Sequence, residues 1–218
     1  MTKKKGITSD KIVELYMNTV LLNGTPKSVY SFALENKFDE TEFYSFFSSF
    51  EALEKQIFAI FCLKTNELLI KNQEYQSYDS KSKLLSFYYT FFEILTANRS
   101  YVFNQLKQNK NKLQSLKLLS HLKKEFTDFI NREIFIDSVD LKNEKINKIR
   151  DKGVAEASWL QLLFTLQFWL EDESPSFEKT DIFIEKSVKA SFDLKDITPI
   201  QSVFDFAKFL WKEKTPRA

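Results

Sequence analysis

Residues 24–53 read GTPKSVYSFALENKFDETEFYSFFSSFEAL and contain two short helical patterns separated by three residues. The patterns cover residues 26–35 and 39–46, and Asn-Lys-Phe at 36–38 forms the turn between them. Two short helices that cross steeply over so short a turn have the geometry of a helix-turn-helix. This stretch therefore predicts a helix-turn-helix near the N-terminus.

The rest of the chain also has the turn residues and helix-start signals of a helical protein. Only 3 glycines and 4 prolines occur in 218 residues, which leaves little room for the tight turns of sandwiches, barrels or hairpins. A hydroxyl residue precedes proline at Thr25-Pro26, Ser174-Pro175 and Thr198-Pro199, as is typical of helix starts. The predicted fold class is all-α, with helices near 9–22, 26–35, 39–46, 49–72, 80–97, 100–111, 113–131, 145–171, 175–193 and 199–213.

Local signals refine some of these boundaries. Asp39-x-x-Glu42 and Ser48-x-x-Glu51 have the spacing of capping boxes. Gly24 follows an apolar stretch and suits the left-handed end of a helix. The segment 133–141 has a strand-like pattern without a partner strand, so we expect it to be irregular or briefly helical.

Composition excludes several classes of protein. The scattered glycines form neither a dinucleotide-binding fingerprint nor a P-loop. With 43% apolar and 28% charged residues, the chain can bury a substantial core as one domain or two small ones. The N-terminus lacks an apolar signal region, and the longest apolar-rich stretch, 159–170, is too short for a transmembrane segment. We therefore expect a cytoplasmic protein, which agrees with the single cysteine, Cys62.

The sequence offers no recognisable catalytic or metal site. Cys62 and His121 are the only cysteine and histidine, too few for a typical structural zinc site. His121 has no nucleophile motif nearby, and Cys62 lies in an apolar run. The acidic run 171–173 reads as solubilising charge. We expect neither an enzyme nor a cofactor.

The apolar positions of the N-terminal stretch agree in register with one family motif, G-x-x-T-T-V-x-D-I-A-x-x-A-G-V-S-x-G-T-L-Y-x-Y-F-x-S-K-E-x-L. The matching positions are Gly24, Ser28, Val29, Phe32, Ala33, Phe38, Phe43, Tyr44, Phe47, Ser49, Glu51 and Leu53. In these residues the sequence resembles the TetR family of bacterial repressors. The resemblance implies a three-helix helix-turn-helix over residues 1–50, called the head here. It also implies a helical-bundle ligand-binding and dimerisation domain over residues 51–218, called the body.

The resemblance also implies that the head binds operator DNA. The residues expected to face the DNA are Lys4, Lys5, Lys27, Ser28, Tyr30, Glu40, Thr41, Tyr44 and Ser45. Several departures from the motif fall on this face. The turn glycine is replaced by Lys37, and the lysine that would meet a phosphate is replaced by Phe50.

Charge argues against DNA binding by the head. Between Ile7 and Glu54 the chain carries eight acidic and three basic residues, a net charge of −5. Affinity for DNA comes largely from cations that meet phosphates. The alternative is therefore a helix-turn-helix kept only as a scaffold.

Two groups of apolar residues in the body suggest a ligand pocket and a dimer interface. The resemblance to the TetR family implies that such a pocket and such an interface exist. For each group the alternative is that its residues only pack within the core of one chain. The pocket would hold an apolar, elongated or aromatic molecule, and its residues are Phe87, Tyr88, Phe91, Phe92, Trp159, Leu163, Phe164 and Phe168. The interface would form a four-helix bundle with a second copy through Phe183, Val188, Phe192, Val203, Phe206 and Leu210.

Two functions follow from these features. The first is a TetR-like, ligand-responsive transcriptional regulator, a repressor that binds operator DNA as a homodimer and an apolar small molecule in its body. The alternative is a TetR-shaped protein that binds a lipid or isoprenoid and whose helix-turn-helix no longer binds DNA. The acidic head and the 23 phenylalanines motivate this alternative.

Overall fold

The computed structural model describes residues 6–107, 112–134 and 144–196. Every regular element in these ranges is a helix, and none of these residues belongs to a strand. The all-α prediction is therefore confirmed for the part of the chain that the structure describes.

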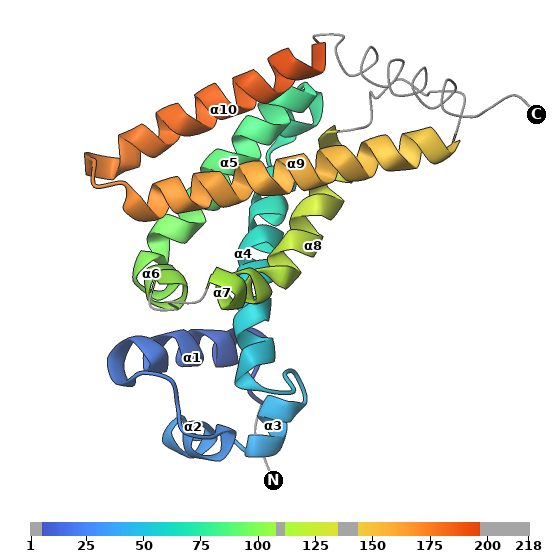
Figure 1. Cartoon of the computed structure of the whole chain (residues 1–218). Coiled ribbons are helices and arrows are strands. Elements are labelled where there is room, and N and C mark those ends of the chain that lie inside the picture. The colour runs from blue at the N-terminus through green and yellow to red at the C-terminus, as the bar shows by residue number, and fades with distance from the viewer. Residues whose placement is uncertain (1–5, 108–111, 135–143, 197–218) are drawn as a thin grey trace, which may run out of the picture.

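The head forms one end of the molecule (Figure 1). It consists of α1 (Ser9–Asn23), α2 (Val29–Glu35), α3 (Glu40–Tyr44) and the first turns of α4 (Phe50–Lys71). Helices α2 and α3 contact each other across the short turn, as in a helix-turn-helix. Helix α4 continues from the head into the body without a break.

The body packs around α4, which contacts α5 and α8. Helices α9 and α10 lie side by side across the end of the body that is far from the head (Figure 1), and α10 also contacts α5. The elements of the body are η1 (Gln73–Ser77), α5 (Ser80–Ala97), α6 (Arg99–Lys107), α7 (Lys112–Leu118), α8 (Ser120–Phe129), the π turn η2 (Ile130–Ile134), α9 (Glu144–Glu171), η3 (Pro175–Phe177) and α10 (Glu178–Asp196).

Two start positions differ from the sequence prediction. The second helix begins at Val29 instead of Pro26, because Ser28 and Ser31 cap it: the Ser31 N–H donates to Ser28 Oγ at 3.1 Å and the Ser28 N–H to Ser31 Oγ at 3.3 Å. Helix α4 is capped by Ser49 instead of Ser48, since extended backbone at Ser49 brings its Oγ to 3.1 Å from the Ala52 nitrogen.

Two other local predictions hold, and one predicted helix is divided. The Asp39 N–H donates to Glu42 Oε2 at 3.0 Å, which confirms that half of the predicted capping box. Gly24 ends α1 with a φ of 79°, a conformation that favours glycine. The predicted helix 113–131 is divided into α7 and α8, and the predicted helix 199–213 lies outside the described residues.

One hydrophobic core extends through head and body. It includes Ile12 of α1, Ile57 of α4, Phe91 of α5 and Val188 of α10, all fully buried. Burying a side chain of this size contributes about 1.5–3 kcal/mol. Because α4 carries the core from one end to the other, head and body are packed together.

Candidate functional site

The outward surface of the helix-turn-helix displays most of the residues predicted to face DNA. Lys27, Ser28 and Tyr30 are exposed at the start of α2, and Thr41, Tyr44 and Ser45 are exposed along α3 and just after it. Tyr30 is 62% and Tyr44 52% exposed, although both are large aromatic side chains. Glu40 is half-buried, and Lys4 and Lys5 lie outside the described residues.

The turn of the helix-turn-helix has the conformation of a glycine turn without its glycine. Lys37 has a φ of 59°, in the left-handed region. The Phe38 N–H donates to the Ala33 oxygen at 3.1 Å and closes the end of α2. A non-glycine residue in this region costs about 1–2 kcal/mol. Lys37 thus preserves the turn that the motif requires, at a cost in stability.

Phe50 belongs to the core of the head and not to the surface that the sequence predicts to face DNA. Its ring stacks on Tyr16 at 5.1 Å and meets Phe43 edge to face at 5.5 Å. It also lies 5.8 Å from the ring of Phe32. At this position the motif has a lysine that would meet a phosphate, whereas Phe50 packs against the aromatic rings of the head.

The carboxylate of Glu42 is bound within the head. Its Oε1 accepts from the Ile7 N–H and its Oε2 from the Asp39 N–H, both at 3.0 Å. These bonds hold the segment before α1 against the start of α3. Part of the negative charge of the head is thus used for folding.

An acidic residue in the first turns of α4 lies at the contact between the head and the body. Glu54 of α4 accepts a hydrogen bond from the hydroxyl of Tyr16 of α1 at 2.6 Å. Burial raises the pKa of the Glu54 carboxyl, although the bond from Tyr16 opposes this shift. Helix α6 contacts α1 here, and its Tyr101 is fully buried. This junction joins α1, α4 and α6.

The aromatic residues predicted to line a ligand pocket are mostly packed in the core. Phe87, Tyr88 and Phe91 are 0% exposed, and Phe92 and Trp159 are 4% and 5% exposed. Their rings contact one another and the aromatic residues of α8; Phe87, for example, stacks on Phe129 at 4.3 Å. Leu163 and Phe168 are half-buried, and Phe164 is 63% exposed on α9. The structure thus brings five of the eight into one cluster and places Phe164 apart from it.

The residues predicted for the dimer interface are divided between core and surface. Val188 is 0% exposed within one chain, whereas Phe183 and Phe192 are half-buried. Val203, Phe206 and Leu210 lie outside the described residues. Phe183 stacks on Phe168 of α9 at 4.7 Å, which joins the two outer helices.

Sequence reasoning did not predict that apolar side chains of α9 and α10 would stay exposed within one chain. Leu160 and Phe164 of α9 are 52% and 63% exposed, and Ile182 of α10 is 50% exposed. Leu160, Phe164 and Phe168 follow at four-residue spacing, a signal that could have found this surface.

At the end of α9, Arg99 and Asp172 make contacts that the sequence did not predict. Arg99 of α6 donates through Nη1 to the Trp169 oxygen at 3.0 Å, and its guanidinium lies 4.5 Å from the Trp169 ring and 4.4 Å from the Phe177 ring. Asp172 is not solubilising charge, as its acidic neighbours had suggested, but is 7% exposed. Burial alone would raise its pKa, but hydrogen bonds from the side chains and backbone N–H groups of Ser174 and Thr180 lower that pKa to about 2.

The described residues contain no group of three or more His, Cys, Asp or Glu side chains that could hold a metal ion. Cys62 is fully buried, and burial raises the pKa of its thiol to about 12. His121 is exposed. In the described part of the chain, no helix is both long and apolar enough to cross a membrane.

Comparison with known families finds a match over the C-terminal part of the chain. A family model described as the C-terminal domain of tetracyclin repressor-like proteins matches residues 83–210, which is more than half of the chain. The matched segment runs from α5 through α10 and contains the aromatic cluster and the apolar surface of α9 and α10. Among curated proteins, none matches the chain.

Proposed function

The chain belongs to the tetracyclin repressor-like (TetR) family of transcription regulators, and from this we propose that it is a ligand-responsive repressor that binds operator DNA as a homodimer. The observation that carries the proposal is the outward surface of the helix-turn-helix. Tyr30, Thr41 and Tyr44 are exposed there, and hydroxyl side chains of this kind contact phosphates and bases in protein–DNA complexes. Glu42, by contrast, is bound within the head.

A salt titration of DNA binding tests this proposal. Fluorescence anisotropy would follow the full chain on labelled duplexes from the neighbourhood of its own gene. We expect affinity to fall as salt rises, because phosphate contacts release counterions. Tyr44→Ala should weaken binding, whereas Tyr89→Ala, which removes an exposed tyrosine of α5, should not. Absence of binding at low salt would refute the regulator.

A two-fold pair of chains would place two heads on one operator. Heads that read successive major grooves must lie about 34–36 Å apart. A ligand in the body regulates binding only if it has different affinities for two spacings of the heads. The exposed apolar residues Leu160, Phe164 and Ile182 support α9 and α10 as part of the interface.

The second candidate is a lipid- or isoprenoid-binding protein whose head no longer binds DNA. It is supported by the acidic residues at the start of α3, Asp39 and Glu40, and by Phe50 in place of a phosphate-binding lysine. Mass spectrometry of the purified protein would detect a lipid that remains bound. A retained lipid together with no DNA affinity would favour this candidate over the first.

A further inference from the structure

Helix α3 and the residues that follow it contain no side chain that can bind a purine base with two hydrogen bonds. In the major groove, arginine and lysine bind O6 and N7 of guanine, and asparagine and glutamine bind N6 and N7 of adenine. None of these four residue types occurs from Phe38 to Glu54, the segment that contains α3. In the proposed function α3 lies in the major groove, as the second helix of a helix-turn-helix does. Its specificity must then come from other contacts.

The exposed side chains of α3 match what pyrimidines present in the same groove. Thymine presents its C5 methyl group, and cytosine presents an N4–H donor. Thr41 is exposed and carries a methyl group of its own, and Tyr44, three residues later, is 52% exposed. Residues three apart lie side by side on a helix, so both side chains can offer apolar surface to thymine methyl groups.

The Tyr44 ring is held in place by the core of the head. It meets the ring of Phe43 edge to face at 5.6 Å, and Phe43 is fully buried. Phe46, two residues after Tyr44, is 48% exposed and extends the apolar surface past the end of α3. A ring that is already ordered loses little conformational entropy when a methyl group packs against it, which favours this contact.

The hydroxyl groups of this surface cannot select one purine over the other. Ser45 donates its hydroxyl hydrogen to the Thr41 oxygen at 3.0 Å, so this hydrogen is already bound within the chain. The hydroxyls of Thr41 and Tyr44 each offer a single donor, and the N7 acceptor that such a donor reaches is present in both adenine and guanine. These hydroxyls therefore do not distinguish the two purines.

Glu40 is the carboxylate of α3 that is available to a base. Glu42 accepts from the N–H groups of Ile7 and Asp39, whereas the Glu40 carboxylate has no hydrogen bond or ion pair with the described residues. Glu40 is half-buried and lies four residues before Tyr44, which places both on the same side of the helix. An ionised carboxylate accepts from N4–H of cytosine and is repelled by the O6 and N7 acceptors of guanine.

We propose that α3 reads pyrimidines: thymine methyl groups pack against Thr41 and Tyr44, and a cytosine N4–H donates to Glu40. The inference rests on the proposed binding of operator DNA and adds the chemical class of the bases that the head recognises. Each half-site of the operator then has thymine and cytosine on the strand that lies nearest α3.

Removal of the thymine methyl groups from the DNA tests the first contact. Selection from duplexes with a randomised centre first gives the sequence that the full chain prefers. Fluorescence anisotropy then compares this duplex with one in which uracil replaces thymine throughout the preferred site, which changes only the C5 methyl groups. We expect the uracil duplex to bind about four- to fifteenfold more weakly, as one or two methyl groups lose their apolar contact. Equal affinity for the two duplexes would overturn the proposal.

Glu40→Gln tests the second contact by a change of preference. Glutamine binds adenine with two hydrogen bonds, so selection with this variant should replace a cytosine of the preferred site with adenine. Glu35→Gln is the matched control, because it removes the same charge from the exposed end of α2 and should leave the preferred sequence unchanged. An unchanged preference in Glu40→Gln, or the same change in both variants, would overturn the assignment of Glu40.

Failure of this inference can be told apart from failure of the proposed function. If no duplex is enriched from the pool and none binds at low salt, the DNA-binding regulator is refuted and the reading of pyrimidines with it. If the selected duplex binds but the uracil duplex binds equally well, only the reading of pyrimidines is overturned, and the regulator stands.

Discussion

Lys37 departs from the motif in residue type, but its backbone keeps the left-handed conformation that the motif's turn glycine would adopt. The sequence revealed that the turn glycine was missing, and the structure shows that the turn keeps the left-handed conformation without it. Glu42 and Phe50 likewise depart from the motif at the surface expected to face DNA, and both are used for folding. Their roles depend on contacts with α1 and the segment before it, which the spacing of residues 24–53 does not reveal.

We expect Lys37→Gly to stabilise the protein by about 0.5–1 kcal/mol. Relief of the left-handed strain contributes about 1–2 kcal/mol, and the extra freedom of glycine in the unfolded chain removes about 0.5–1 kcal/mol of that gain. Urea unfolding measures the change. Lys37→Ala is the control, because it removes the same charge but keeps Cβ; an equal gain in both variants would show that charge, and not strain, is responsible.

Glu42 and Glu40 should respond differently to truncation although both are acidic residues of α3. Glu42→Ala leaves the N–H groups of Ile7 and Asp39 without their acceptor, so we expect a loss of about 1–2 kcal/mol in the free energy of unfolding. Glu40→Ala should change that free energy by no more than about 0.5 kcal/mol. Similar losses in the two variants would contradict the role given to Glu42.

Glu54 should give part of the stability of the protein an unusual pH dependence. Its folded-state pKa is raised above the usual 4.5, so its contribution to stability is full below that value and is lost as the pH rises through the folded-state pKa. Glu54→Gln should therefore gain stability over the native chain as the pH rises above 4.5. Unfolding by urea from about pH 4 to about pH 8 measures the difference.

Glu51 provides a control of opposite sign. A hydrogen bond from Lys55, at 2.7 Å, lowers the pKa of the Glu51 carboxyl. Its contribution is therefore present above the usual 4.5 and is lost as the pH falls, so Glu51→Gln should lose stability relative to the native chain as the pH rises. Differences of the same sign in the Glu51 and Glu54 variants would contradict our account of Glu54.

The helical elements were largely predictable, and their ends were less so. Apolar spacing predicted α1, α4, α5 and α9 within a few residues, because each carries several turns of buried residues. Starts at Ser28 and Ser49 were missed, since neighbouring hydroxyl residues compete for the same role and only the backbone conformation selects one. The break between α7 and α8 has no glycine or proline to mark it.

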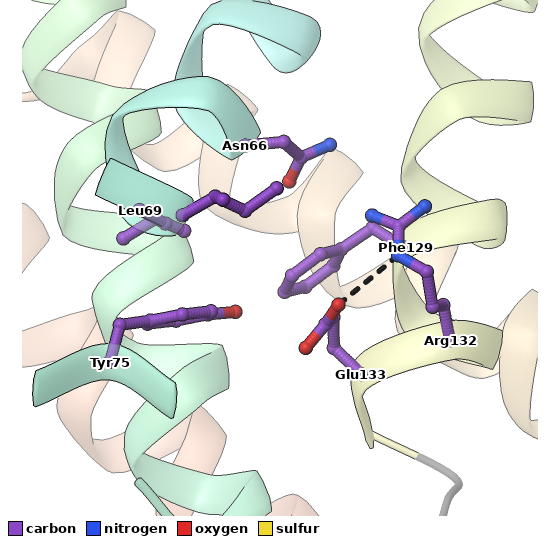
Figure 2. A pocket seen from close by; sticks show the side chains of 7 residues that line it. Asn66, Leu69, Tyr75, Phe129, Arg132 and Glu133 are labelled. Carbon is purple, nitrogen blue, oxygen red and sulfur yellow. Dashed lines mark hydrogen bonds and ion pairs between the residues drawn. The ribbon is translucent and has the colours of Figure 1, made fainter. Parts of the chain in front are cut away.

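At the candidate sites, the sequence predicted which residues share a helix face, but not what those residues contact. Periodicity predicted that Phe87 and Phe91 share a face, but not whether that face borders a hollow. Tyr75 of η1 and Asn66 of α4 line one hollow (Figure 2) only because η1 and α8 pack against α4, and this packing leaves no pattern in the chain.

The attachment of α6 to the end of α9 should depend on Arg99 specifically. We expect Arg99→Lys to lower the free energy of unfolding by about 1–3 kcal/mol, because lysine retains the charge but not the planar group that packs against Trp169 and Phe177. Arg132→Lys, at a side chain 55% exposed, should have a smaller effect. Thermal unfolding compares the variants, and equal losses would contradict a special role for the stacked guanidinium.

The whole molecule presents its most exposed apolar ring among the described residues at Phe164, on the outer surface of α9. If α9 and α10 pair with a second copy, Phe164→Glu should raise the dimer dissociation constant at least about tenfold, because it buries a charge in the interface. Leu68→Glu, at an equally apolar position 52% exposed on α4, is the control. Sedimentation equilibrium measures both, and an unchanged dimer in Phe164→Glu would exclude this surface from the interface.

Helix α4 spans both ends of the molecule as one uninterrupted rod. At about 1.5 Å per residue, its 22 residues extend about 33 Å, from Phe50 in the aromatic core of the head to Lys71 in the body. A tilt of about 5° at the end in the body would displace the other end by about 3 Å. Under the proposed function, α4 is therefore the lever arm through which a ligand bound in the body would shift the surface proposed to read DNA.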